Sequence, residues 1–210
     1  MPRSAPRLAE NPPMPLRKSR KFDRNQALRR YEKHRRRNLL AQPGAHPFVI
    51  VLDHLKAGYN VPKIFRSADA FGAAAVHLIN IGPFDPTAAK GGLKSVPARF
   101  HDEFAQSYDA LTREGYTLYT LEADQGEHLT GVRFPRKCAF IFGHEERGLS
   151  FDPGDYPGIR KLSIPQYGRV ESLNVSVAAS IVMYEYTRQH GGEPRTHVPR
   201  AAPRRVRRPG

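Results

Sequence analysis

The segment IPQYGRVESLNVSVAASIVMYE, residues 164–185, begins with the composition of a loop and continues with that of a helix. Pro165 and Gly168 predict irregular backbone in its first part. The residues after Ser172 are small and mostly apolar, and no charged residue follows until Glu185. We therefore predict a helix that begins near Ser172, whose hydroxyl would accept a hydrogen bond from a free N–H of the first turn as an N-cap.

The predicted helix is apolar on two faces, a pattern that indicates burial on two sides. One face repeats at helical spacing through Val175, Ala179, Val182 and Tyr186, and the other through Leu173, Val177, Ile181 and Tyr184. A sheet can cover one of these faces. The other face needs a different cover, and a second copy of the chain would provide it, so we expect a homodimer.

Short apolar runs alternate with helical patterns along the chain. The predicted strands lie within 48–52, 73–81, 116–121, 138–142 and 160–164, and the predicted helices before the last one within 22–41, 63–72 and 104–115. This alternation predicts an α/β domain with a mainly parallel sheet and helices on both faces. Ligands of such sheets bind where loops leave the carboxyl ends of the strands. The loops after 138–142 and 160–164 are therefore the candidates for a site.

The formal net charge of +14 is concentrated at the two ends of the chain. Residues 1–45 carry thirteen Lys or Arg against three Asp or Glu, and residues 188–210 carry seven Arg against one Glu. We divide the chain into a basic, partly disordered N-terminal extension (1–45), a globular domain (46–190) and a basic disordered tail (191–210). Basic arms bind polyanions by releasing condensed counterions, and arginine suits phosphate geometry. We expect a nucleic acid as partner; the alternative is a pair of tails that only aid solubility.

Several chemistries find no support in the sequence. It has neither G-x-G-x-x-G nor G-x-x-x-x-G-K-[ST], which argues against an ordinary dinucleotide or nucleoside-triphosphate site. Its nine histidines form no H-E-x-x-H motif, so we predict no metal site. The single cysteine, Cys138, lies in an apolar run and is expected in the core. The N-terminal residues lack the apolar region of a signal peptide, and no apolar run approaches the ~18 residues of a membrane span. We expect a cytoplasmic protein without membrane contact.

Three segments each combine polar residues and glycines at a defined spacing. The first reads N-x-x-x-x-x-R-x-A-x-x-F-G, through Asn60, Arg66, Ala68, Phe71 and Gly72. The second reads F-G-x-E-x-x-G, through Phe142, Gly143, Glu145 and Gly148. The third reads I-P-x-x-G-x-x-x-S-L-N-V-S, through Ile164, Pro165, Gly168, Ser172, Leu173, Asn174, Val175 and Ser176. Each segment alone could be an ordinary helix, turn or loop without a functional role. Together, over about 46–190, they resemble the three motifs of the SpoU/TrmH family of RNA 2′-O-ribose methyltransferases, which belongs to the SPOUT superfamily.

The resemblance implies a fold, a cofactor and a set of site residues. It implies a C-terminal trefoil knot, a rare exception among chain connections, and a dimer as the active unit. It implies S-adenosylmethionine (S-adenosyl-L-methionine) as cofactor, bound by Leu121, Gly143, Ile164, Ser172 and Leu173. The implied catalytic residues are Arg66, Asn60, Glu145, Ser172 and Asn174, of which Ser172 and Asn174 would also cap the last helix. Because a guanidinium is very hard to deprotonate, we favour a role for Arg66 in binding an RNA phosphate and stabilising the developing alkoxide. The candidate RNA-binding residues are Arg66 and, in the N-terminal extension, Arg29, Arg30, Arg35, Arg36 and Arg37.

The substrate stays open within this interpretation. A small domain with short basic extensions resembles the tRNA members of the family more than the rRNA members, many of which carry a separate N-terminal domain. An rRNA methyltransferase and an RNA-binding protein of this fold without catalysis are the alternatives. A dinucleotide-dependent oxidoreductase is disfavoured by the missing glycine fingerprint. Ser95 stands where relatives often have a tryptophan, which leaves the local substrate surface undefined.

Overall fold

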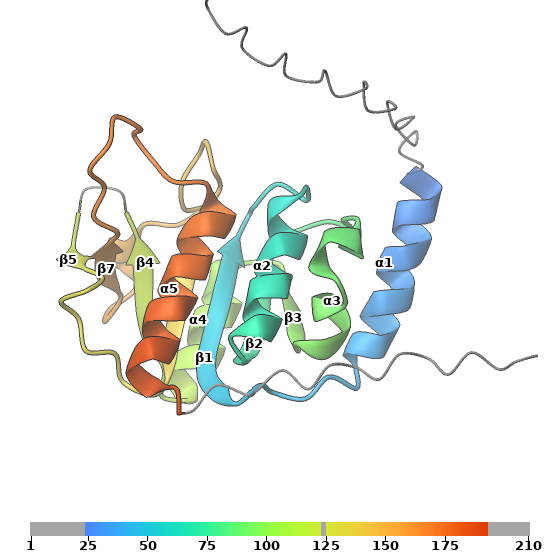
Figure 1. Ribbon diagram of the computed structural model, residues 1–210, viewed down its shortest axis with the longest axis horizontal. Helices are drawn as coiled ribbons and strands as arrows, with labels where there is room; N and C mark the ends of the chain where they lie inside the picture. The colour runs from blue at the N-terminus through green and yellow to red at the C-terminus, as the bar shows by residue number, and fades with distance from the viewer. Residues whose placement is uncertain (1–23, 123–124, 193–210) are drawn as a thin grey trace, which may run out of the picture.

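The computed structural model describes residues 24–122 and 125–192 of the chain. Its centre is a seven-stranded sheet in the order β3-β2-β1-β6-β4-β7-β5 (Figure 1), in which every strand pair is parallel. The strands are β1 His46–Asp53, β2 Ala73–Ile79, β3 Ala98–His101, β4 Thr117–Leu121, β5 Glu127–His128, β6 Cys138–Phe142 and β7 Arg160–Ser163. The predicted α/β class with a parallel sheet is confirmed.

Helices cover both faces of the sheet, as predicted. The α-helices are α1 Arg24–Asn38, α2 Asn60–Ala70, α3 Gly92–Ser95, α4 Phe104–Arg113 and α5 Val175–His190, and short 3-10 helices lie at Pro86–Ala89 and Pro153–Asp155. Figure 1 shows α5, α2, α3 and α1 in that order across one face. Side chains of α4 belong to the apolar cluster of the opposite face, which includes Phe104 and Leu111. The central strands β1 and β6 are therefore buried on both sides, which explains their uninterrupted apolar runs.

The last helix differs in its start from the sequence prediction. Asn174, not Ser172, is the N-cap of α5, because its side-chain oxygen accepts a hydrogen bond from the N–H of Ser176 at 3.0 Å. Ser172 is exposed and belongs to the preceding loop. The prediction of Ser172 as N-cap was wrong because Ser and Asn both cap helices well, and only the backbone conformation decides between two candidates this close together.

The two predicted faces of α5 have different environments within one chain. The face with Ala179, Val182 and Tyr186 is completely buried in the core. On the other face, Val177 and Tyr184 are 47% and 59% exposed. The prediction that one face of α5 is buried against the sheet is confirmed. The second face is exposed to solvent in the single chain at Val177 and Tyr184.

Helix α1, predicted within 22–41, packs on the domain through buried Tyr31 and Asn38. The strand β3, the two-residue strand β5 and the short helix α3 were not predicted, because each is short and stabilised chiefly by its neighbours. Residues 1–23 of the predicted N-terminal extension fall outside the described residues, as does almost all of the tail 191–210, so the predicted disorder is not tested. The trefoil knot stays a prediction.

Candidate active site

A cavity of about 430 Å³ opens where β4, β6 and β7 end and α5 begins. Because these strands are parallel and adjacent, their carboxyl ends meet at one edge of the sheet. This is the edge at which ligands of parallel sheets bind. The cavity is lined by Leu121, Glu122, Phe142, Gly143, Glu145, Ile164, Gln166, Ser172, Leu173, Asn174, Val175 and Ala178.

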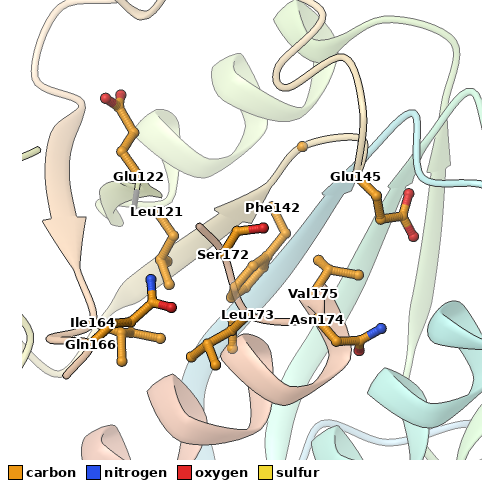
Figure 2. Close-up of a pocket in the computed structure, with 12 residues that line it drawn as sticks. Leu121, Glu122, Phe142, Glu145, Ile164, Gln166, Ser172, Leu173, Asn174 and Val175 are labelled. Carbon is orange, nitrogen blue, oxygen red and sulfur yellow. The ribbon is translucent and has the colours of Figure 1, made fainter. Parts of the chain in front are cut away.

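The structure brings all five predicted cofactor-binding residues to this one cavity (Figure 2). They come from the end of β4, the loop after β6, the loop after β7 and the approach to α5, and they are Leu121, Gly143, Ile164, Ser172 and Leu173. Residues more than 50 positions apart along the chain therefore meet. Their role in binding stays a prediction.

The lining fits a ligand with an apolar ring and hydrogen-bond donors, as S-adenosylmethionine has. Side chains of Leu121, Phe142 and Leu173 supply apolar wall. The Oε1 atom of Gln166 is buried and has no hydrogen-bond partner among the residues that the structure describes. A buried acceptor without a donor costs about 1–3 kcal/mol, and an amino group of the cofactor would remove this cost. Gln166 was not predicted as a site residue, because it occupies an unspecified position of the pattern I-P-x-x-G-x-x-x-S-L-N-V-S.

Hydrogen bonds connect the three motifs at the rim of the cavity. Asn60, the first residue of α2, donates through Nδ2 to Oε1 of Glu145 at 2.7 Å. Asn174 donates through Nδ2 to Oδ1 of Asn60 at 3.2 Å. The Oδ1 atom of Asn174 accepts from the N–H and the hydroxyl of Ser176 at 3.0 and 2.6 Å. One polar chain thus runs from the loop after β6, through α2, to the start of α5, and it contains three of the predicted catalytic residues.

The pKa of Glu145 lies below its ordinary value. Burial acts to raise this pKa, but the hydrogen bond from Asn60 and backbone hydrogen bonds at Glu145 and Lys56 together outweigh it. The carboxylate is therefore ionised at neutral pH and acts as an acceptor. This favours a role in orienting Asn60 over a role as general acid.

Glycines shape the loop that carries Glu145. A Cβ atom at Gly143 would lie 2.5 Å from the carbonyl carbon of Gly148, a distance that no side chain tolerates. Gly148 has a φ of +72°, in the left-handed region that glycine adopts readily. His144 and Gly148 exchange two backbone hydrogen bonds, at 2.7 and 2.9 Å, which close the loop. These contacts explain both glycines of the F-G-x-E-x-x-G pattern.

A buried carboxylate anchors the other end of the same loop. Asp53, at the end of β1, is fully buried and accepts hydrogen bonds from the N–H and the hydroxyl of Ser150 at 2.6 and 2.8 Å. His54 Nδ1 lies 2.8 Å from the same carboxylate. At the surface, Lys56 and Glu146 form an ion pair at 2.6 Å. The position of Glu145 is therefore set from both sides of its loop.

Arg66 lies apart from the cavity within one chain. It is exposed on α2 and does not line the cavity. Within the described ranges, 24–122 and 125–192, its side chain has no hydrogen bond or ion pair. The structure therefore does not unite Arg66 with the predicted cofactor-binding residues in a single chain.

The predicted RNA-binding arginines of α1 fall into two groups. Arg29, Arg36 and Arg37 are exposed. Arg30 bonds to Thr87 at 3.3 Å and to Gln26 at 2.6 Å, and the Arg35 guanidinium lies 4.4 Å from the centre of the Phe100 ring. The last two arginines are thus engaged within the protein.

The described part of the chain contains no group of three or more His, Cys, Asp or Glu side chains placed to hold a metal ion. None of its helices has the length and apolar character needed to cross a membrane. Cys138 is buried, and burial raises the pKa of its thiol to about 12.

The chain matches the model of the SpoU rRNA Methylase family over residues 47–184. It is 30% identical to a tRNA (guanosine(18)-2′-O)-methyltransferase of Thermus thermophilus over 145 residues, 67% of this chain and 74% of the relative. The chain spans 59% to 74% of the length of the first curated relatives it matches.

Solved structures agree with this match. One, described as giving insights into the 2-OH methylation of C/U34 on tRNA, is 32% identical, with a TM-score of 0.59 over 71% of this chain and all of the other. The SpoU methyltransferase AviRb of Streptomyces viridochromogenes, in complex with the cofactor AdoMet, is 25% identical, with a TM-score of 0.61 over 70% of this chain and 58% of the other. Fold and sequence define an RNA methyltransferase of the SPOUT class. The chain belongs to the SpoU/TrmH family, as predicted.

Proposed function

We propose that this protein transfers a methyl group from S-adenosylmethionine to a ribose 2′-hydroxyl of RNA, and that the RNA is a tRNA. The observation that carries the proposal is the polar chain Glu145–Asn60–Asn174 at the rim of a cavity whose lining fits the cofactor. The relatives named for methylation of tRNA support it. The bound cofactor supplies a methyl group on a sulfonium, ready for in-line displacement.

The chemistry required of the protein is positioning and charge stabilisation. The bound cofactor would supply the methyl group that the ribose oxygen accepts, and the proton of the hydroxyl would pass to water. Arg66 binds an adjacent RNA phosphate and stabilises the negative charge that develops on the ribose oxygen. It needs no proton transfer of its own, which suits a guanidinium.

The polar chain at the rim orients the reacting groups. Glu145 holds the amide of Asn60, and Asn60 is fixed from its other side by Asn174. Because Asn60 begins α2 and Arg66 lies further along that helix, this contact fixes the start of the element that carries Arg66. Ser172, which lines the cavity but caps no helix, acts through its contact with the cofactor.

The active unit of the proposal is a homodimer. Arg66 lies outside the cavity of its own chain, and the exposed face of α5 with Val177 and Tyr184 has no cover in the single chain. A partner subunit on this face buries both side chains and brings its own α2 toward the cavity. Arg66 then acts on a cofactor held by the other subunit.

The decisive experiment compares Arg66→Ala with Lys63→Ala. Lys63 is the matched control, since it is an exposed cation one turn earlier on the same helix. Transfer of a labelled methyl group to total cellular RNA and cofactor binding by calorimetry are measured for both. Arg66→Ala should lose about 10²–10³-fold in transfer rate with unchanged cofactor affinity, and Lys63→Ala should keep most of its rate. Near-normal turnover of Arg66→Ala would show that the assignment is wrong.

The substrate is identified by mapping ribose methylation in RNA from cells with and without the protein. Loss of one methylated ribose in tRNA supports the proposal. Loss of one in rRNA establishes the alternative, to which the family description SpoU rRNA Methylase corresponds. Absence of cofactor binding in calorimetry would instead indicate an RNA-binding protein without catalysis.

A further inference from the structure

Helix α1 is docked on the domain. Its contact face repeats at helical spacing through Ala27, Tyr31 and Asn38, which are 8%, 4% and 7% exposed. The Tyr31 ring meets Phe84 edge-to-face, with centroids 5.1 Å apart. A face with this spacing and burial has a defined orientation, so every other residue of the helix has a fixed direction too.

Asn38 fixes the end of the helix. Its Nδ2 donates to the carbonyl oxygens of Leu93 and Val96 at 2.8 and 2.7 Å, and its Oδ1 accepts from the N–H of Ala98 at 2.9 Å. Three backbone groups of α3 and the segment into β3 are thus satisfied by one buried side chain. Losing such a side chain leaves buried polar groups without partners, so the last turn of α1 is held against α3.

Cations lie on the last turns of α1 and on the helix that these turns contact. Lys33 and Arg37, one turn apart on α1, are exposed. Lys94 lies on α3 between Leu93 and Val96, whose carbonyl oxygens accept hydrogen bonds from Asn38, so its backbone is close to the last turn of α1. We call Lys33, Arg37 and Lys94 the cationic ledge.

The cationic ledge continues toward the proposed catalytic arginine. A Cβ atom at Gly92, the first residue of α3, would lie 2.4 Å from the carbonyl oxygen of Phe65 and 3.1 Å from the nitrogen of Arg66. Helix α3 therefore contacts α2 at the turn that carries Arg66. Figure 1 shows α1, α3 and α2 in this order on one face. Helix α3, which carries Lys94, therefore lies between α1 and the helix that carries Arg66.

We propose that the cationic ledge is a preformed binding surface for the phosphates of a helical stem in a folded RNA, whose target nucleotide reaches Arg66. This inference rests on the proposed function, whose substrate it specifies. Asn38 and Tyr31 fix the backbone of the helix that carries Lys33 and Arg37, so binding requires no ordering of that backbone. A stem presents phosphates that are fixed as well, whereas a single strand must be ordered first. Double-stranded RNA is recognised by shape and by its backbone in this way.

The test measures binding to bulk tRNA and to an oligouridylate of matched length by fluorescence anisotropy across a salt series. The ledge variant carries Lys33→Ala, Arg37→Ala and Lys94→Ala. The matched control carries Arg113→Ala, Arg133→Ala and Arg136→Ala, which remove the same charge from exposed positions outside α1, α2 and α3. Phosphate contacts do not depend on sequence, so bulk tRNA serves even if it holds no target site.

For bulk tRNA, we expect a smaller slope of the logarithm of the binding constant against the logarithm of the salt concentration. The slope of the ledge variant should be smaller in magnitude than that of the wild type by about 2 to 3, since each phosphate contact contributes roughly 0.7 to 0.9. The control variant should change it by less than about 1, and oligouridylate should respond weakly to both. An unchanged slope in the ledge variant would overturn the inference. Equal losses for tRNA and oligouridylate would refute the preference for a stem.

A second variant tests the positioning role of Asn38 without removing a charge. Asn38→Ala should lower the tRNA slope as the ledge variant does, while calorimetric affinity for S-adenosylmethionine stays at the wild-type value. Wild-type tRNA binding in Asn38→Ala would contradict the docking argument. Methyl transfer to total cellular RNA is assayed separately. If the wild type transfers no methyl group, the proposed function is wrong. If the wild type does transfer methyl groups but the salt slope of the ledge variant is unchanged, only the inference about the cationic ledge is wrong.

Discussion

Asn174 serves stability and positioning through different atoms, and two substitutions separate these effects. Its Oδ1 caps α5 by accepting from the N–H and the hydroxyl of Ser176, and its Nδ2 donates to Asn60. Asn174→Ala removes all three hydrogen bonds. Asn174→Asp keeps the acceptor oxygen and removes only the donor to Asn60.

The magnitudes follow from these contacts. Loss of an N-cap costs about 1 kcal/mol, and loss of the bond from the Ser176 hydroxyl costs about another 1 kcal/mol. Asn174→Ala should therefore lower the free energy of unfolding by about 2 kcal/mol and the midpoint of thermal unfolding by about 4–8 °C for a chain of this size. Asn174→Asp should stay within about 0.5 kcal/mol of the wild type, because Asp caps as well as Asn and its charge suits a helix N-terminus.

Methyl transfer should respond differently from stability. Both variants lose the bond that holds Asn60 beside Glu145, and a small displacement of a positioning group costs up to about 100-fold in rate. We expect both to be slowed by at least about tenfold at a temperature where both are folded. Thermal unfolding is followed by circular dichroism and transfer by labelled cofactor. Full activity in Asn174→Asp would refute the positioning role, and wild-type unfolding of Asn174→Ala would refute the cap.

Three further predictions concern the loop after β6 and the open face of α5. The pKa of Glu145 is lowered in the folded protein. Its ionised carboxylate therefore stabilises the fold above the unfolded pKa, and this stabilisation is lost as the pH falls through the folded pKa. The difference in unfolding free energy between wild type and Glu145→Gln, measured by denaturant titration, should narrow between about pH 6 and about pH 3. Gly143→Ala forces a Cβ atom against the backbone of Gly148, should destabilise the protein by about 1–3 kcal/mol and should weaken cofactor binding in calorimetry. Tyr184→Glu, at a position 59% exposed in one chain, should leave the fold intact and lower the mass in light scattering from dimer to monomer; an unchanged dimer would place the interface elsewhere.

Elements with strong periodicity were predicted well from the sequence. The runs that form β1 and β6 are uninterrupted because both of their faces are buried, and the buried face of α5 follows its helical spacing. The edge strand β3 and the helix α3 were missed, since each has four residues and depends on neighbours for its contacts. The N-cap was misplaced by two residues, because the choice between Ser172 and Asn174 depends on backbone geometry.

The sequence by itself determined the parallel α/β class, the family and part of the cavity lining, including Leu121, Gly143 and Leu173 but not Gln166, because these depend on local patterns and on motifs that the chain carries. Only the tertiary structure decided which of these residues meet. It showed that Asn60, Glu145 and Asn174 form one hydrogen-bonded chain, that Arg66 stands outside the cavity, and that α1 is fixed by Asn38. The physical reason is that hydrogen bonds and burial are set by distances across the fold, and a sequence pattern does not contain those distances.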